Sequence, residues 1–173
     1  MPNSLNKLIK NRIFWLVLFS ISLLSILFAI FLQNFKLIYP CLYCVYERVA
    51  VIGIALITFT LIFFHKTKKI NFLLMLVLLI TATKGALLNI EHIQLELHPP
   101  LFSACSQETN YFPKSFPLNE WFPSLFKSYG DCSMVKWSFF NIALTHWLLL
   151  FFILYILVSI VGLISIILDN KKR

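Results

Sequence analysis

The stretch IFWLVLFSISLLSILFAIFL, residues 13–32, decides the fold class because it is apolar almost throughout and carries no charge. An apolar run of about 18 residues or more is long enough to cross the hydrocarbon core of a bilayer as a helix. Comparable runs follow at about residues 45–64, 70–90 and 142–168. The whole chain is 60% hydrophobic and only 13% charged, whereas about a quarter of a soluble domain is charged. The sequence therefore predicts a single membrane domain over residues 1–173, an all-α bundle of four transmembrane helices.

A cleaved signal peptide is the alternative interpretation of residues 13–32. The apolar core of such a peptide is about 7–15 residues long and is followed by a cleavage site of small residues. The run in this chain is longer, and the sequence QNFKLIYP that follows it offers no pair of small residues. We therefore interpret the first run as a retained helix.

The basic residues indicate the orientation of the four predicted spans. Nine of the 15 lie before the first span, between the second and the third, or at the end of the chain: Lys7, Lys10, Arg12, Lys66, Lys68, Lys69, Lys171, Lys172 and Arg173. Since four spans place these three segments on one side, the positive-inside rule assigns them and both termini to the cytoplasm. Residues of about 33–44 and 91–141 then form two external loops. The net charge of +8 thus indicates membrane topology rather than binding to nucleic acid.

All four cysteines fall in these two external loops. Cys41 and Cys44 lie in the first loop, and Cys105 and Cys132 lie in the second. An even number of cysteines on the external face indicates an oxidising compartment and disulfide chemistry. Four cysteines allow three pairings, and the sequence leaves all three open.

The first pair has the spacing CxxC within PCLYCVYER, residues 40–48. A disulfide across so short a loop gains little stability and stores strain, and strained, exposed disulfides are the ones that exchange readily. Pro40 suits the first turn of a helix, whose positive end favours the thiolate form of a cysteine. Arg48 follows Cys44 by one helical turn, so that its charge can hold a Cys44 thiolate. The pattern predicts redox chemistry.

Half of a zinc site is the alternative interpretation of the CxxC. Zinc sites built from two halves use closely spaced ligands in both, but Cys105 and Cys132 are widely separated in the sequence. We therefore predict no bound metal. For the second pair itself, a plain stabilising disulfide across the second loop competes with a relay of electrons between the two pairs, and the sequence leaves both open.

Taken together, these motifs resemble the disulfide bond formation protein B (DsbB) family of quinone-dependent thiol oxidoreductases. The resemblance covers nearly the whole chain and includes the four spans. It is carried by PCLYCVYER, by EH at Glu91 and His92, by FSAC ending at Cys105, by PLNEW at residues 117–121, and by GDC ending at Cys132. Lys84 departs from it, because familiar members carry Arg at that position.

The resemblance implies an enzyme that makes disulfides in a bacterial inner membrane, with its active cysteines facing the periplasm. It would reoxidise a periplasmic thioredoxin-like dithiol oxidase (DsbA-like) and pass the electrons to a membrane quinone, ubiquinone or menaquinone. The reduced partner would attack Cys105 and form a mixed disulfide, after which the released Cys132 would attack Cys41. Cys44 would then deliver the electrons to the quinone. The four cysteines are thus the predicted catalytic residues.

The predicted quinone-binding residues are Arg48 and His92. Arg48 would polarise the quinone and stabilise the Cys44 thiolate, and His92 is equally consistent with a quinone contact or with a hydrogen-bonded interface histidine. We interpret Glu47 and Lys84 more simply, as side chains that extend to the membrane surface. Residues 116–129, with aromatic residues among polar ones, suit either a short helix lying in the membrane interface or a loop packed on the bundle.

Two other functions compete with this interpretation. A non-enzymatic membrane protein with a disulfide-stapled external loop would predict a polar pathway through the bundle, and apart from Lys84 the spans lack charges near mid-membrane. An enzyme that carries reducing power outward would be expected to keep redox cysteines within its spans, and the predicted spans contain none.

Overall fold

The computed structural model describes residues 9, 11–37, 39–64, 67–98, 112, 117–128, 130, 132 and 137–171. Among these residues, four helices are long and apolar enough to cross a membrane. They are α2 (Arg12–Phe35), α3 (Leu42–Phe64), α4 (Lys68–Leu97) and α7 (Leu144–Lys171). The predicted fold class, an all-α membrane protein with a four-helix bundle, is therefore confirmed.

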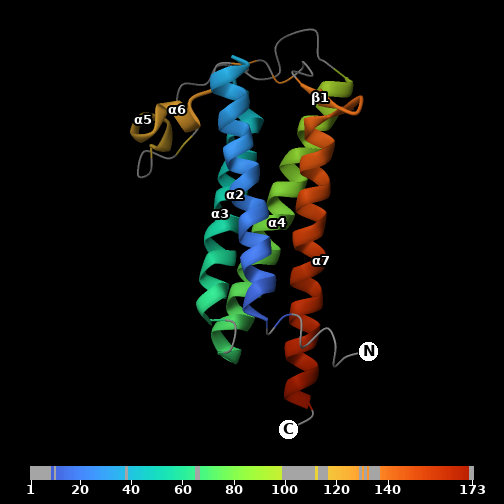
Figure 1. Cartoon of the computed structure of the whole chain (residues 1–173). Coiled ribbons are helices and arrows are strands. Elements are labelled where there is room, and N and C mark those ends of the chain that lie inside the picture. The colour runs from blue at the N-terminus through green and yellow to red at the C-terminus, as the bar shows by residue number, and fades with distance from the viewer. Residues whose placement is uncertain are drawn as a thin grey trace.

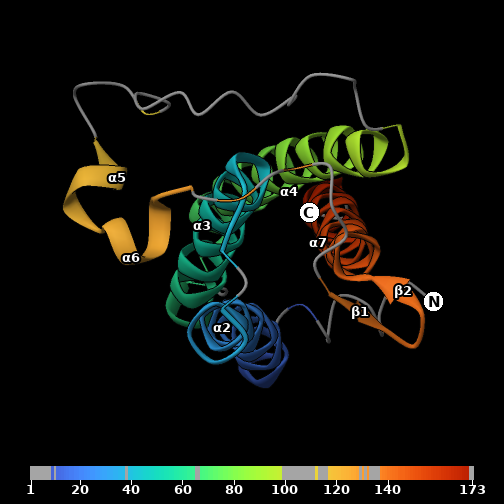
Figure 2. The same ribbon diagram turned by 90° about the horizontal axis from the view of Figure 1, so that it is seen from above.

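The four long helices run alternately up and down (Figure 1). Seen from above, α2, α3, α4 and α7 follow one another in an arc, so that each packs mainly on its neighbours in the sequence (Figure 2). The two ends of the arc are joined by the hydroxyl of Tyr155 on α7, which donates a hydrogen bond to the Leu18 carbonyl at 2.6 Å and shares another with Ser22 at 2.7 Å. The arc is thus closed by polar contacts between α2 and α7.

The segment between α4 and α7 adds three small elements at one end of the bundle. The single-turn helices α5 (Leu118–Trp121) and α6 (Pro123–Phe126) lie beside α3, and an antiparallel ribbon of β1 (Ser138–Phe139) and β2 (Ile142–Ala143) leads into α7 (Figure 2). α2 begins and α7 ends at the opposite end (Figure 1). The cysteine-bearing start of α3 therefore lies at the end where these small elements gather.

Close packing of α4 on α7 depends on two glycines. A Cβ atom on Gly85 would lie 2.3 Å from the ring of Phe152, and one on Gly162 would lie 2.8 Å from the sulfur of Met75. Phe152 and Met75 are fully buried. Small residues at such contacts let transmembrane helices approach closely, which is how bundles gain packing energy inside a lipid environment.

Most helix ends differ by a few residues from the spans that hydropathy predicts, and two of these differences bear on the site. α3 begins at Leu42 rather than near residue 45, and α4 continues beyond Ile90 to Leu97. Hydropathy ends a span where polar residues begin, but α4 continues through them: His92 and Glu96 point into the bundle and find partners there, and Glu91 is exposed. Glu91, His92 and Glu96 therefore stand on a helix rather than in a loop.

The aromatic segment predicted at residues 116–129 forms two separate turns, α5 and α6. Pro123 explains the break, because it lacks the N–H that a continuous helix would need but is well suited to the first position of a new one. Trp121 and Phe122 are exposed, whereas Phe126 is buried. Phe116 and Tyr129 lie outside the described residues.

Candidate active site

The first cysteine pair lies at the beginning of α3. The Cys44 N–H donates a hydrogen bond of 3.2 Å to the sulfur of Cys41. N–H groups in the first turn of a helix lack partners within the helix, so the Cys41 sulfur satisfies one of them as a capping side chain does. Both cysteines are free thiols, with Cys41 buried and Cys44 half-buried. A helix begins at the CxxC, as the sequence predicts. The sulfur that its first-turn amide contacts is that of Cys41.

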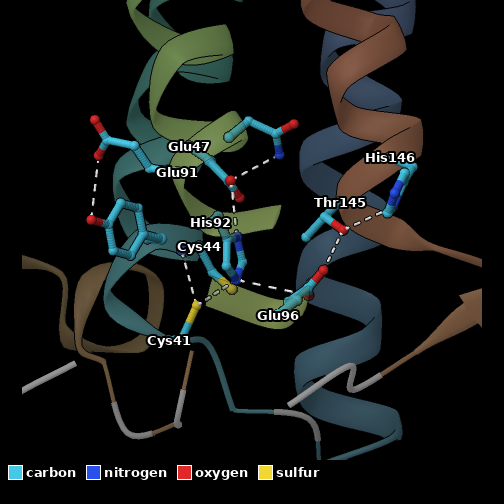
Figure 3. A network of polar contacts seen from close by, with 10 residues as sticks. Cys41, Cys44, Glu47, Glu91, His92, Glu96, Thr145 and His146 are labelled. Carbon is cyan, nitrogen blue, oxygen red and sulfur yellow. Dashed lines mark hydrogen bonds and ion pairs between the residues drawn. The ribbon is translucent and has the colours of Figure 1, made fainter. Parts of the chain in front are cut away.

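His92 connects this pair to α4 (Figure 3). Its Nε2 lies 3.5 Å from the Cys41 sulfur, and its Nδ1 lies 3.0 Å from Oε1 of Glu47. The same Glu47 oxygen accepts a hydrogen bond of 2.9 Å from the Asn89 side chain. Since an ionised carboxylate only accepts, Nδ1 carries the proton in this contact and Nε2 faces the sulfur.

The interpretation of Glu47 as a surface anchor is wrong. Its side chain points inward from α3 and is only 3% exposed. Burying a carboxylate is costly unless hydrogen bonds compensate, and His92 and Asn89 supply them. Glu47 therefore fixes the orientation of the His92 ring at the cysteine pair.

A second set of contacts extends from His92 to α7 (Figure 3). Oε1 of Glu96 lies 3.9 Å from Nε2 of His92, and its Oε2 accepts a hydrogen bond of 2.7 Å from Thr145. On the other face of His92, the ring of Tyr43 stacks at a centroid distance of 5.8 Å. The histidine is thus held on every side by α3, α4 and the start of α7.

A cavity of about 610 Å³ lies beside the cysteine pair and is lined by all four long helices. Most of its wall is apolar, with residues such as Ile26, Leu32, Leu148 and Phe151. The polar groups gather on one side: Cys41, Cys44, Glu47, Arg48, His92, Glu96 and Thr145. A largely apolar cavity with a few convergent polar groups is the usual form of a small-molecule site.

Arg48 lines the same cavity, and its hydrogen bonds reach α2 and the segment between α4 and α7. Its Nη1 donates to the carbonyl of Leu125 at 2.6 Å and to Oε1 of Gln33 at 3.1 Å. Gln33 in turn donates to the carbonyl of Ser124 at 2.7 Å. The guanidinium, which is only 8% exposed, thus attaches α6 to the bundle beside the cysteines. Its predicted contact with a thiolate stays a prediction.

The second cysteine pair is described in part. Cys132 is buried and is in a disulfide, whereas Cys105 lies outside the described residues. The N–H of Gly130 donates a hydrogen bond of 3.1 Å to the carbonyl of Pro40. Because Gly130 is close in sequence to Cys132 and Pro40 precedes Cys41, this bond holds the two cysteine segments side by side.

Sequence reasoning missed Asn89, Glu96 and Thr145. The first two share a helical face with His92, since positions separated by three, four and seven residues lie along one side of a helix. That signal was available, but ending the span at residue 90 hid it. Lys84 lies on an exposed part of α4 and is not among the residues that line the cavity.

Known proteins are similar to this chain over nearly its full length. The profile of the family described as "Disulfide bond formation protein DsbB" matches residues 11–162. The chain belongs to the DsbB family. A protein named disulfide bond formation protein B from Blochmanniella pennsylvanica is 37% identical over 99% of this chain and 98% of its own length. Proteins with the same name from Psychromonas ingrahamii and Pasteurella multocida are 39% and 35% identical, over 95% and 90% of this chain and 88% and 86% of their own lengths.

Membership of the DsbB family establishes the class of protein and implies its class of chemistry. The chain is a multi-pass bacterial membrane protein of disulfide bond formation, and its family implies thiol oxidoreductase activity. That chemistry requires cysteines that can exchange electrons as thiols and disulfides. In the described part of this DsbB-family chain, Cys41, Cys44 and Cys132 are gathered at one end of the bundle.

Proposed function

We propose that this protein oxidises a DsbA-like dithiol protein of the periplasm and passes the electrons to membrane quinone, ubiquinone or menaquinone. The observation that carries the proposal is the hydrogen bond between Gly130 and Pro40, which keeps the Cys132 segment next to the Cys41 segment at the cavity wall. Thiol–disulfide exchange needs a thiolate and access to a disulfide sulfur. Two cysteine segments held together at a cavity supply the short path that a relay requires.

The proposed reaction consists of two exchanges and one oxidation. The partner's dithiol becomes a disulfide as a Cys105–Cys132 disulfide is reduced, through a mixed disulfide at Cys105. The Cys105 and Cys132 thiols then reduce a Cys41–Cys44 disulfide, with Cys132 attacking Cys41. The resulting Cys41–Cys44 dithiol loses two electrons and two protons and becomes a disulfide again. A bound quinone supplies the acceptor for those two electrons and two protons.

The size and the lining of the cavity support a quinone as the acceptor. A quinone combines a flat apolar ring with carbonyl oxygens that accept hydrogen bonds, and the cavity combines an apolar wall with Arg48 and His92 on one side. Cys44 is the more accessible cysteine of the pair, because Cys41 is only 1% exposed. We assign to Cys44 the contact with the acceptor, to Arg48 the stabilisation of negative charge beside it, and to His92 the orientation of the Cys41 sulfur.

We further propose that the bundle lies in the bacterial inner membrane with the cysteine end towards the periplasm. The described basic residues at the other end support this orientation: α2 begins with Arg12, α4 begins with Lys68 and Lys69, and α7 ends with Lys171. Cytoplasmic segments next to spans carry an excess of Lys and Arg. The cysteines then face a compartment in which disulfides persist.

Quinone reduction by the purified protein tests this function. The protein in detergent is given a reduced dithiol partner and a soluble quinone, and the wild type is compared with Cys44→Ala, Cys105→Ala and the control Thr60→Ala. Thr60 is partly exposed on α3 and bonds only its own helix, so its variant should turn over normally. Loss of turnover in both cysteine variants is expected. Turnover that survives in Cys105→Ala would show that the second pair is only a staple, whereas no turnover in the wild type would favour a non-enzymatic protein.

A further inference from the structure

We propose that the reduced Cys41–Cys44 pair and His92 form a binding site for a soft divalent metal ion, with zinc as the ion that it fits best. The ligand atoms of these three residues all lie within 4.8 Å of one another. Ligand atoms around one tetrahedral zinc ion are about 3.5–3.8 Å apart, given Zn–S and Zn–N bonds of about 2.3 Å and 2.0–2.1 Å. The distance of 3.5 Å between the Cys41 sulfur and Nε2 of His92 already matches. The other pairs need at most about 1 Å of approach.

The histidine is prepared as a metal ligand by its other nitrogen. A ligating histidine almost always donates its second N–H to a carboxylate or carbonyl, which fixes the ring and raises the basicity of the ligating nitrogen. Here Nδ1 of His92 contacts Glu47 at 3.0 Å, and Asn89 holds the same carboxylate oxygen at 2.9 Å. Nε2, the nitrogen left to ligate a metal, is therefore the one that faces the sulfur. A CxxC motif alone would not provide this buried support.

The composition and the surroundings of the cluster also suit zinc. Two thiolates neutralise the charge of the ion, so that a neutral unit is buried rather than a charged one. Two cysteines and one histidine form a known zinc ligand set, in which the fourth position is left to water or another group. All three ligands line the cavity, and the fourth position would face it.

Metal binding at this site depends on the redox state of the pair. Zinc binds thiolates, so a dithiol takes up the ion with release of protons, whereas a Cys41–Cys44 disulfide has no thiolate to offer. The site would thus exist in the reduced protein alone. Zinc would hold the pair reduced and block the acceptor side of the cavity. Only this inhibitory consequence rests on the proposed function, since the binding itself does not.

Equilibrium metal binding to the reduced protein tests the proposal directly. Zinc is titrated in competition with a coloured chelator, and cobalt(II) serves as a second probe because thiolate ligands give it an intense charge-transfer absorption. The variant Cys105→Ala/Cys132→Ala excludes binding at the second pair. We expect one ion per chain in the wild type and in this double variant, and no binding after oxidation of the protein.

Variants of the cluster distinguish the proposed site from binding elsewhere. His92→Ala and Cys44→Ser should each weaken zinc binding by at least about 100-fold, and Glu47→Gln, which only loosens the supporting carboxylate, by about 10-fold. Glu47→Gln keeps the proposal testable if His92→Ala fails to fold. Binding that is unchanged in folded variants, or absent from the reduced wild type, would overturn the proposal. The zinc titration contains no quinone, so its outcome does not depend on whether the protein reduces quinone. A protein that binds no zinc could still carry out the proposed reaction.

Discussion

The two cysteine regions are attached to the molecule in different ways. Cys41 and Cys44 belong to a long helix, and their surroundings are fixed by side chains from α3 and α4, above all Glu47 and His92. The described parts of the second region are attached to the bundle by hydrogen bonds such as those of Gly130, Gln33 and Arg48. All three of these hydrogen bonds reach backbone groups of the second region.

This difference suits a relay between the two pairs. Exchange requires the sulfurs of two regions to meet, and Cys41 is buried in the structure. We expect the second region to move towards a partner or towards Cys41, while the region on α3 keeps its orientation at the cavity. We infer that the fixed pair sets the geometry of electron delivery and that the attached segment carries electrons to it. The following variants test this difference by removing contacts from one part of the molecule and leaving those of the other in place.

The largest effect is expected from Glu47→Ala, which breaks the fixed region. It leaves two buried donors, on His92 and Asn89, without their acceptor, at about 1–3 kcal/mol each. The free energy of unfolding should fall by about 3 kcal/mol, and turnover should fall with it. Glu91→Gln is the matched control, because Glu91 is an exposed carboxylate at the same end of α4. Equal losses in the two variants, measured by unfolding in detergent, would contradict the role of Glu47.

Arg48→Leu should free the second region and leave the fixed region folded. Hydrogen bonds to a charged group contribute about 1.5–3 kcal/mol, so amide hydrogen exchange in residues 117–128 should become about 10- to 100-fold faster. Arg12→Leu removes an arginine at the other end of the bundle, where it lies over the Phe63 ring. Exchange as slow in Arg48→Leu as in this control would mean that the contact with Leu125 does not hold the segment.

Gly85→Ala tests how rigidly α4 is held, and with it His92. The added Cβ would lie 2.3 Å from the buried Phe152 ring, and such overpacking costs about 1–3 kcal/mol. Gly53→Ala is the control, since its Cβ would meet Thr81 at 3.3 Å and a small shift relieves the contact. The midpoint of thermal unfolding should drop clearly for Gly85→Ala and little for Gly53→Ala. A larger drop for Gly53→Ala would show that α4 and α7 can move apart with little loss of stability.

Tyr155→Phe should have the smallest effect. The variant removes only the hydroxyl that joins α7 to Leu18 and Ser22 of α2. Hydrogen bonds between transmembrane helices contribute about 0.6 kcal/mol on average and at most about 1.7. We expect a loss of about that size on unfolding in detergent and normal exchange in residues 117–128. A larger loss of unfolding free energy would mean that the hydrogen bonds between α2 and α7 stabilise the fold more than the packing of neighbouring helices does.

The sequence predicted the fold well because hydropathy alone identifies helices that cross a bilayer. Pro40 also indicated that a helix opens at the CxxC, earlier than hydropathy placed the second span. Sequence reasoning failed for Glu47, because the partners that make a buried carboxylate tolerable lie on α4, far away in the sequence. The end of α4 was missed for the same reason.

The attachment of Arg48 could not be predicted from side-chain patterns at all. Its partner in the second region is the backbone carbonyl of Leu125, and a carbonyl is present at every position of the chain. Only the folded structure determines which carbonyl Arg48 contacts. The sequence thus pointed to the residues that we propose carry the chemistry, and the structure was needed to find what holds them in place.

The central claim is that the two cysteine regions exchange disulfides with each other, and a trapping experiment tests it most directly. In Cys44→Ala the Cys41 thiolate has no disulfide partner on α3, so it can attack Cys132 in a Cys105–Cys132 disulfide, forming a Cys41–Cys132 disulfide and releasing Cys105 as a thiol. In membranes that contain this variant, free thiols are blocked and the disulfide-linked peptides are identified by mass spectrometry. We predict that a Cys41–Cys132 disulfide accumulates. Membranes in which Cys41 remains a free thiol while Cys132 stays bonded to Cys105 would contradict the account.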